Sequence, residues 1–424
     1  MVAMPKASLS SLFHATTGLA PQRRKVPLTQ PLRHPRYRRI WLANMVSNLG
    51  TWIQTFASGW LVASLSQSAT TTSLVQTATY VPVFLFALFA GVVADAVHRP
   101  KFLFFCNLFN AICAAAMALL VWSGKVSSGP VLAITFCLGI GTAFIWPAWQ
   151  AAMSSLVEPE EVEAAATLNN LSYNLSAIIG PALGGILFGW IGAGALFLAN
   201  AMSFAGLLAV YWHWWRESDA PPSVRGAFVA RFRAGVATAR GCPRFRRILR
   251  NVCSVFFSTI AFASLLPVFV RDVLHMRAGV YGTLMGCLGG GAVMAAFFLP
   301  RVRARVDKTG VLAGALLVYG SMLLAMPHTT SLAVLAPLIV CGGMAWSATV
   351  STLNAAAQLS FPAEVRARTL SIYLFVMSGG YAAGSVVWGL VADAWGVRSA
   401  FLAAGACVIL NALVLLGADR KTPI

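Results

Sequence analysis

The sequence predicts an all-α membrane protein with twelve transmembrane helices in two pseudo-symmetric six-helix bundles. Of its 424 residues, 58% are hydrophobic and only 10% are charged, whereas a soluble globular protein carries roughly 25% charged residues. The apolar residues also gather in runs long enough to cross a bilayer, which takes about 20 residues per helix. One long polar interruption near the middle of the chain separates the two sets of runs.

The apolar runs place the helices in order along the chain. They predict spans at 38–66, 72–97, 102–123, 130–153, 164–190, 194–215, 248–273, 279–300, 309–327, 330–355, 368–394 and 399–418. This order divides the chain into a basic tail, a first bundle, a cytosolic linker, a second bundle and a short tail, at 1–36, 37–216, 217–247, 248–418 and 419–424.

The formal charge of +19 would suggest nucleic acid in a soluble protein, but its distribution indicates a membrane protein. With the N-terminus inside, all but four of the 31 Lys and Arg fall in cytosolic segments; the four are Lys125, Arg271, Arg277 and Arg398. This is the pattern of the positive-inside rule. We therefore expect an inner-membrane protein with both termini in the cytoplasm, contacting anionic lipids and not nucleic acid.

The two polar segments outside the bundles have different expected roles. The basic tail 1–36 lacks the apolar core and cleavage site of a secretory signal peptide, and its composition favours disorder. In the linker, a helical stripe predicts an amphipathic helix on the cytosolic membrane surface; the stripe consists of Phe228, Val229, Phe232 and Val236. A solvated linker with chance periodicity is the alternative.

A weak internal repeat supports the division into two halves. The chain reads LVEPEEVEAAATL at 156–168 and LSFPAEVRARTL at 359–370, with a proline, an acid-Val pair and a Thr-Leu before the next helix in both. Two related halves around a midplane site are common among secondary transporters.

The loop GVVADAVHRPK at 91–101 carries an acid and two bases where a predicted helix ends. Its Gly91, Asp95, Arg99 and Lys101 resemble the G-x-x-x-D-x-x-x-R-[KR] signature of the major facilitator superfamily, with the departure that Pro100 separates the bases. The resemblance implies that this loop latches the halves on the cytosolic side. The alternative is topology alone, with Asp95 capping the next helix.

The segment GPALGG in the fifth predicted helix combines a bend with close packing. Pro181 lacks a backbone N–H donor, which bends the helix. The small residues Gly180, Gly184 and Gly185 let a neighbouring helix approach closely. The segment resembles the antiporter signature of superfamily exporters, with Ser176 in place of the first glycine. This implies efflux, and helix packing without any coupling role is the alternative.

Longer stretches resemble the enterobactin-exporter-like branch, also called the transmembrane secretion effector family. They lie at 38–62, 147–157, 167–185, 351–374 and 379–393. The resemblance implies proton-driven export of a small amphipathic molecule, a drug or a siderophore, by alternating access. Trp149 departs from the expected basic residue, so a cytosolic charge contact is expected to be missing.

Polar residues within the apolar helices mark a candidate cavity, because such side chains turn toward the bundle interior or a wet space. The first helix presents a polar face of Asn44, Asn48, Thr51, Thr55 and Ser58, and the fifth presents Asn170, Tyr173 and Asn174. The plausible contributions from the second half are Ser258, Tyr373, Ser378 and Tyr381. Hydrogen bonding between helices, without ligand contact, is the alternative.

Ionisable residues avoid the predicted span centres. All 12 acids lie in loops or at span ends, so we expect a neutral, aromatic-rich pocket. The near-membrane acids are Asp95, Asp272 and Asp393, and none is singled out as the proton carrier. The chain shows no metal-ligand cluster, C-x-x-C pair, phosphate loop or catalytic triad. We expect a monomeric transporter without cofactor or metal; an uptake permease for a neutral solute and a transport-inactive scaffold or sensor remain alternatives.

Overall fold

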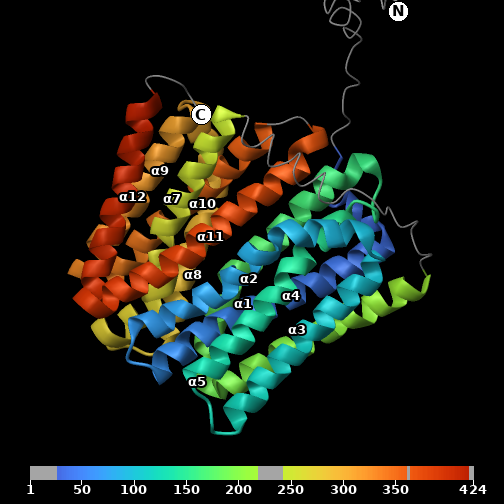
Figure 1. Cartoon of the computed structure of the whole chain (residues 1–424), viewed down its shortest axis with the longest axis horizontal. Coiled ribbons are helices and arrows are strands. Elements are labelled where there is room, and N and C mark those ends of the chain that lie inside the picture. The colour runs from blue at the N-terminus through green and yellow to red at the C-terminus, as the bar shows by residue number, and fades with distance from the viewer. Residues whose placement is uncertain (1–25, 218–241, 361–362, 420–424) are drawn as a thin grey trace, which may run out of the picture.

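The computed structural model describes residues 26–217, 242–360 and 363–419, and every regular element in these ranges is helical (Figure 1). The long helices of the first half are α1 (Pro35–Leu65), α2 (Ala69–Ala96), α3 (Arg99–Trp122), α4 (Ser128–Met153) and α5 (Val162–Glu217). Those of the second half are α7 (Pro243–Val268), α8 (Ala278–Arg303), α9 (Lys308–Ala325), α10 (Leu332–Leu359), α11 (Ala363–Trp395) and α12 (Val397–Asp419). Short η elements lie at Gln30–Arg33, Pro159–Glu161, Phe269–Val273 and Met326–His328.

Helix α5 is two rods joined at one residue. Gly192 interrupts its 56 residues with φ 75° and ψ 172°, a backbone conformation that glycine adopts at little cost. The apolar run Pro159–Glu217 spans 59 residues, more than twice what one crossing needs. The break lies between the two helices that the sequence predicts here. We call the part before Gly192 the first arm of α5 and the part after it the second arm.

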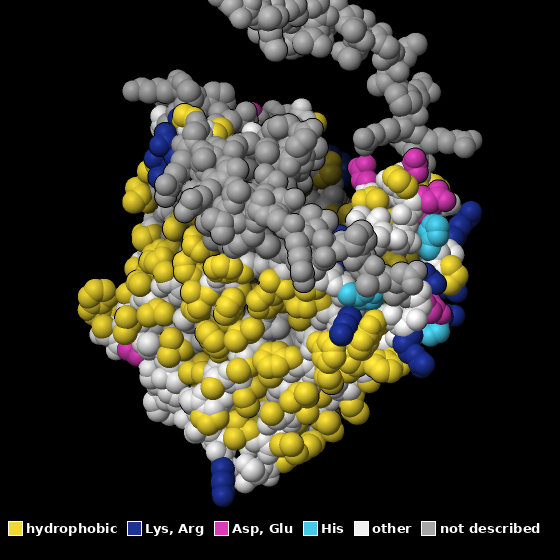
Figure 2. All heavy atoms as spheres, turned by 45° about the vertical axis from the view of Figure 1, so that its right-hand side comes forward, with side chains coloured by type: hydrophobic (Ala, Val, Ile, Leu, Met, Phe, Trp, Pro, Cys, Tyr) yellow, Lys and Arg dark blue, Asp and Glu magenta, His cyan; other side chains and the backbone are white. Residues whose placement is uncertain are grey.

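The surface and the hydropathy agree with a membrane location. Nine stretches of the described residues, on α3 to α5 and α7 to α12, are long and apolar enough to cross a membrane. Figure 2 shows apolar side chains over most of the visible face, with charged side chains gathered toward its ends. Buried groups form the interior, while large apolar residues such as Leu171, Phe297 and Leu410 remain exposed, as lipid-facing residues must.

The helices pack into two groups that meet along two seams. In the first group α1 and α3 pack on α5, and α2 packs on α4. In the second, α7 packs on α11 and α12, α8 on α10, and α9 on α10 and α12. Between the groups, α2 packs on α11 and α5 packs on α8 (Figure 1).

Two helix starts differ most from the sequence-based boundaries, by five residues each. Helix α7 begins at Pro243 instead of 248, because Phe245 and Ile248 are buried although basic residues interrupt the apolar run there. Helix α11 begins at Ala363 instead of 368. The amphipathic helix expected at 228–236 and the tail 1–25 lie outside the described residues.

Candidate functional site

The first arm of α5 packs on a different helix along each of its flanks. On the α1 side, a Cβ added at Gly180 would lie 2.5 Å from Cβ of Trp52, and one at Gly184 would lie 2.8 Å from the Phe56 ring. On the α8 side, a Cβ at Gly185 would lie 2.8 Å from Cα of Gly282. The GPALGG segment therefore brings backbones together on both flanks, which only small residues allow.

Pro181 and Ser176 take part in the same packing. Pro181 is buried, and its carbonyl oxygen would lie 2.7 Å from a Cβ at Gly282. Ser176 is also buried and donates to the carbonyl of Ser172 at 2.9 Å and to that of Met45 in α1 at 3.5 Å. The serine that replaces the first glycine of the signature thus remains small enough for α1 to pack beside it.

A polar strip lies between these two flanks of α5. Asn170, Tyr173 and Asn174 share one helical face with Pro181, because residues three, four and seven apart align on a helix. All three are exposed, and Tyr173 is 41% accessible. The Tyr173 ring meets Trp52 of α1 edge-on with ring centroids 5.7 Å apart. The opposite face is apolar and exposed, with Ile179 at 38% and Ile186 at 50%. The strip therefore points toward the space between α1 and α8, and away from the lipid face.

The polar face of α1 divides into bonded and accessible residues. Asn44 donates to Asn169 of α5 at 3.5 Å, and Ser58 is buried. Thr51 is exposed, while Asn48 and Thr55 are half-buried; the Thr55 hydroxyl donates to its own helix at the carbonyl of Thr51, 2.9 Å away. The accessible part of this face is therefore the middle stretch from Asn48 to Thr55.

The residues expected from the second half lie deeper in the protein. Ser258 is 2% exposed, donates to the carbonyl of Ser254 at 2.9 Å and accepts from Asn411 of α12 at 3.4 Å, so its hydroxyl is used between α7 and α12. The Tyr373 and Ser378 hydroxyls are buried without a hydrogen-bond partner in the described structure. Tyr381 lies at the α2–α11 seam.

A line of aromatic rings runs from that seam into the second half. Tyr80 of α2 stacks on Tyr381 of α11 with centroids 4.4 Å apart. Tyr381 meets Phe256 at 5.0 Å, and Trp346 lies 5.6 Å from Phe256 and 5.9 Å from Tyr319. Sequence reasoning missed Tyr80, Trp346 and Tyr319. Their positions inside apolar spans, away from the ends where aromatic belts lie, were the available signal.

The two seams are held by side chains and backbone along much of their length. Between α2 and α11, the Thr77 and Ser385 hydroxyls lie 2.6 Å apart and Phe84 stacks on Phe375 with centroids 4.3 Å apart. Between α5 and α8, a Cβ at Gly289 would lie 2.8 Å from Cα of Ile178. The groups therefore touch on both sides of the polar strip.

The 91–101 loop is described only in part. Gly91 and Asp95 fall in the last turns of α2, and the structure describes their backbone but not their side-chain contacts. Arg99 and Pro100 open α3, where a proline fits because its missing N–H has no intrahelical partner. His98, not Asp95, is the N-cap of α3, accepting from the Lys101 amide at 3.5 Å.

Lys101 and Trp149 both make contacts within the first half. The Lys101 ammonium lies 5.1 Å from the Trp215 ring centre, a cation–π distance. Trp149 is 5% exposed and donates its indole N–H to the Asn169 amide oxygen at 3.0 Å. An indole thus joins α4 to α5 where the resemblance suggests a base.

The described residues contain no group of three or more His, Cys, Asp or Glu that could hold a metal ion. The strips on α1 and α5 offer amide, hydroxyl and phenol groups together with aromatic faces. Such a surface can bind a molecule by neutral hydrogen bonds and ring contacts.

Residues 27–421 match the transmembrane secretion effector family. The chain belongs to this family. Relatives include the staphyloferrin A transporter of Staphylococcus aureus, 22% identical over 377 residues, which cover 88% of this chain and 94% of that protein. The multidrug efflux pump Tap of Mycobacterium tuberculosis is 22% identical over 396 residues, covering 89% and 92%. The family resemblance expected from the motifs is confirmed, and the chain is a membrane transporter and not an enzyme.

Solved structures of transporters share the fold. A bacterial homolog of the human lysosomal transporter Spinster, in an inward-facing and occupied conformation, superposes with a TM-score of 0.72 at 16% identity, covering 92% of this chain and 98% of that one. A bacterial homologue of the iron transporter ferroportin in an inward-facing state gives 0.71 at 12% identity, covering 91% and 99%. These similarities establish the fold of this family member.

Proposed function

We propose that this protein is a secondary active transporter that exports a small amphipathic compound, a drug or a siderophore, in exchange for protons. The observation that carries the proposal is the polar strip of α5, whose exposed Asn170, Tyr173 and Asn174 lie between the contact with α1 and the contact with α8. Polar groups that are accessible at the junction of two helical groups suit a site that both groups share. The names of the two relatives, one a siderophore transporter and one a multidrug efflux pump, favour the same substrate classes.

The architecture we propose has twelve crossings in two pseudo-symmetric sextets. The two arms of α5 supply the fifth and sixth crossings of the first sextet, and α7 to α12 form the second. Both termini lie in the cytoplasm and the protein resides in the inner membrane as a monomer. The enrichment of Lys and Arg in the segments assigned to the cytosol supports this orientation.

Transport then follows from alternating access, with the two sextets rocking about the site. The α2–α11 and α5–α8 seams change as the site opens to one side and then to the other. The neutral lining favours substrates with apolar surface and a few hydrogen-bonding groups, because a permanent charge would lose hydration there without a charged partner. Asp95 in the 91–101 loop is a coupling candidate from its motif.

Transport by purified protein in liposomes with an imposed pH gradient tests this proposal. We expect substrate-dependent proton flux with some members of a panel of lipophilic drugs and siderophores. Replacing a hydrogen-bonding residue of the strip should raise KM about two- to tenfold, since a neutral hydrogen bond contributes about 0.5–1.5 kcal/mol. The variants are Tyr173→Phe in the strip and Asn48→Ala in the accessible stretch of α1, and Ile179→Ala on the apolar face of α5 is the matched control.

The outcomes separate the alternatives. Movement of neither protons nor substrate would indicate the scaffold or sensor, and substrate entry without proton exchange would indicate a permease. Equal effects of Tyr173→Phe and Ile179→Ala would contradict the assignment of the strip. Loss of proton flux in Asp95→Asn, with substrate binding intact, would support a coupling role for the 91–101 loop.

A further inference from the structure

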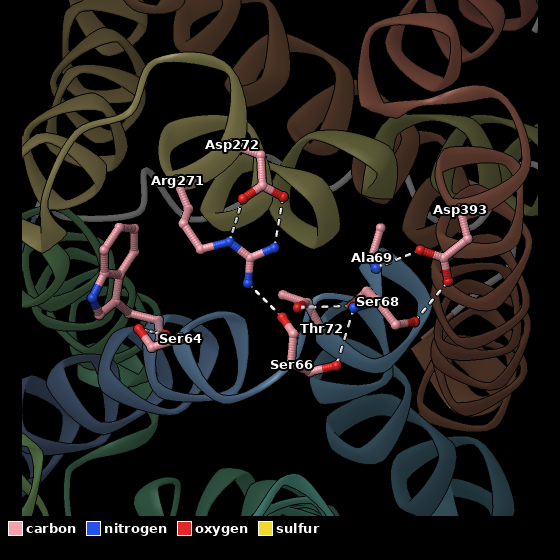
Figure 3. Close-up of polar contacts among 9 residues, drawn as sticks. Ser64, Ser66, Ser68, Ala69, Thr72, Arg271, Asp272 and Asp393 are labelled. Carbon is pink, nitrogen blue, oxygen red and sulfur yellow. Dashed lines mark hydrogen bonds and ion pairs between the residues drawn. The ribbon is translucent and has the colours of Figure 1, made fainter.

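The turn that joins α1 to α2 is bound from two directions by the second half of the chain. The turn consists of Ser66, Gln67 and Ser68, between the last residue of α1 and the first of α2. Figure 3 shows Arg271 and Asp272 on one side of this turn and Asp393 on the other. Because α2 runs from this turn to the 91–101 loop, the turn lies at the end of the molecule opposite that loop.

Asp393 of α11 caps the N-terminus of α2. Its carboxylate accepts from the Ala69 amide at 2.6 Å, from the Thr70 amide at 3.1 Å and from the Ser68 hydroxyl at 2.7 Å. The first N–H groups of a helix have no partner within the helix, and they favour a negative charge. The Ser68 hydroxyl also accepts from the Thr71 amide at 3.1 Å. The start of α2 therefore depends on a carboxylate that comes from 325 residues away.

Arg271 makes the complementary contact at the end of α1. Its guanidinium forms a two-bond ion pair with the neighbouring Asp272, with Nη2 and Oδ2 2.6 Å apart, and donates to the carbonyl oxygen of Ser66. Ser66 is the C-cap of α1, where the helix favours a positive charge. One turn of the first half thus receives a cation at the end of α1 and an anion at the start of α2.

We propose that Asp393 and Arg271 form an outer clasp that holds the two halves closed on the side opposite the 91–101 loop. Here the outer clasp means the contacts of these two side chains with Ser66, Ser68, Ala69 and Thr70. Opening of this side requires α2 to leave α11, and the carboxylate then gives up all three of its hydrogen bonds across the seam. The inference rests on the proposed alternating-access function, because it assigns the clasp to one state of that cycle.

The clasp differs from the rest of the α2–α11 seam in its chemistry. Farther along, the seam consists of a hydroxyl pair and stacked rings, such as Thr77 with Ser385 and Tyr80 with Tyr381. Stacked rings can slide past one another with little loss of contact energy, whereas hydrogen bonds to a carboxylate are strong and directional. The outer clasp is therefore the contact whose removal should change the balance between closed and open states most.

Hydrogen–deuterium exchange on the full-length protein in lipid nanodiscs tests the outer clasp without any substrate. Asp393→Asn keeps the size of the side chain and removes its charge. We expect faster exchange at 66–75 and slower exchange at the opposite ends of α4 and α10, corresponding to a shift of about tenfold or more toward the outward-open state. The matched control is Asp307→Asn, since Asp307 caps α9 within its own half, accepting from the Thr309 and Gly310 amides.

Opposite changes at the two ends distinguish a change of state from local fraying. Faster exchange confined to 66–75 in Asp393→Asn, as expected for loss of a cap alone, would overturn the proposal, as would exchange equal to that of the unmodified protein. Arg271→Gln provides a second variant with the same expected pattern, in case Asp393→Asn does not fold. The exchange measurement needs no substrate. If Asp393→Asn gives the expected opposite changes at the two ends but the transport assay fails, the result would count against the proposed function alone.

Discussion

Replacing Gly282 by alanine should weaken the α5–α8 seam. A Cβ at this position would lie 2.7 Å from Cα of Gly185 and 2.7 Å from the carbonyl oxygen of Pro181. Both neighbours are backbone atoms, so no side-chain rotation can make room. The two helices must separate by about 1 Å to restore ordinary contact distances near 3.5–4.0 Å.

The cost can be estimated from two opposing effects. Overpacking at a close contact costs about 1–3 kcal/mol, whereas replacing a helical glycine by alanine gains up to about 1 kcal/mol. This gain comes from the backbone and applies to both glycines of one helix, so a control position removes it from the comparison. Relative to that control, Gly282→Ala should destabilise the closed α5–α8 contact by about 1–3 kcal/mol. This corresponds to a five- to 150-fold change in the equilibrium between conformations with this contact closed and conformations with it open.

Gly290 is the matched control, because it lies on the same helix and a Cβ there would meet nothing within 4 Å. The assay is the thermal unfolding of detergent-purified protein, followed by transport in liposomes. We expect Gly282→Ala to melt several degrees below Gly290→Ala and to transport more slowly. Equal melting temperatures and equal rates for the two variants would refute the reasoning that backbone contact closes this seam.

Two further predictions concern polar groups buried in the first half. Trp149→Phe removes the donor to Asn169 and should lower stability by about 1 kcal/mol, visible as a lower melting temperature than that of Trp146→Phe, a residue that is 41% exposed. Asn200→Leu removes the donor to Gln54, 2.5 Å away, and leaves a buried amide unpaired at a cost of about 1–3 kcal/mol. Adding Gln54→Leu to that variant should restore most of the melting temperature, and no recovery would show that packing volume, and not the unpaired amide, causes the loss.

The positions of the helices were predictable because apolar runs record contact with lipid directly. The break at Gly192 falls between two predicted spans for this reason. The start of α7 was misplaced because Phe245 is buried beside basic residues, and a run-based reading ends where charge begins. Length and hydropathy are properties of a single segment, so they predict where each helix lies but not which other helix it contacts.

Cross-seam partners could not be predicted in the same way. Sequence reasoning found that Asp393 was an acid near the membrane, but not that it caps a helix of the other half. Likewise, Ser258 looked available until α12 supplied Asn411 as its neighbour. These contacts depend on which faces of distant helices meet, and that information is absent from the periodicity of either segment.

The shortness of the α1–α2 connection has a mechanical consequence. Only Ser66, Gln67 and Ser68 separate the two helices, and three extended residues reach roughly 10 Å at most. A displacement of the end of α1 must therefore also move the start of α2, and the reverse. In the proposed transport cycle, α1 and α2 would therefore move together at this end, and one motion instead of two would set the width of the opening.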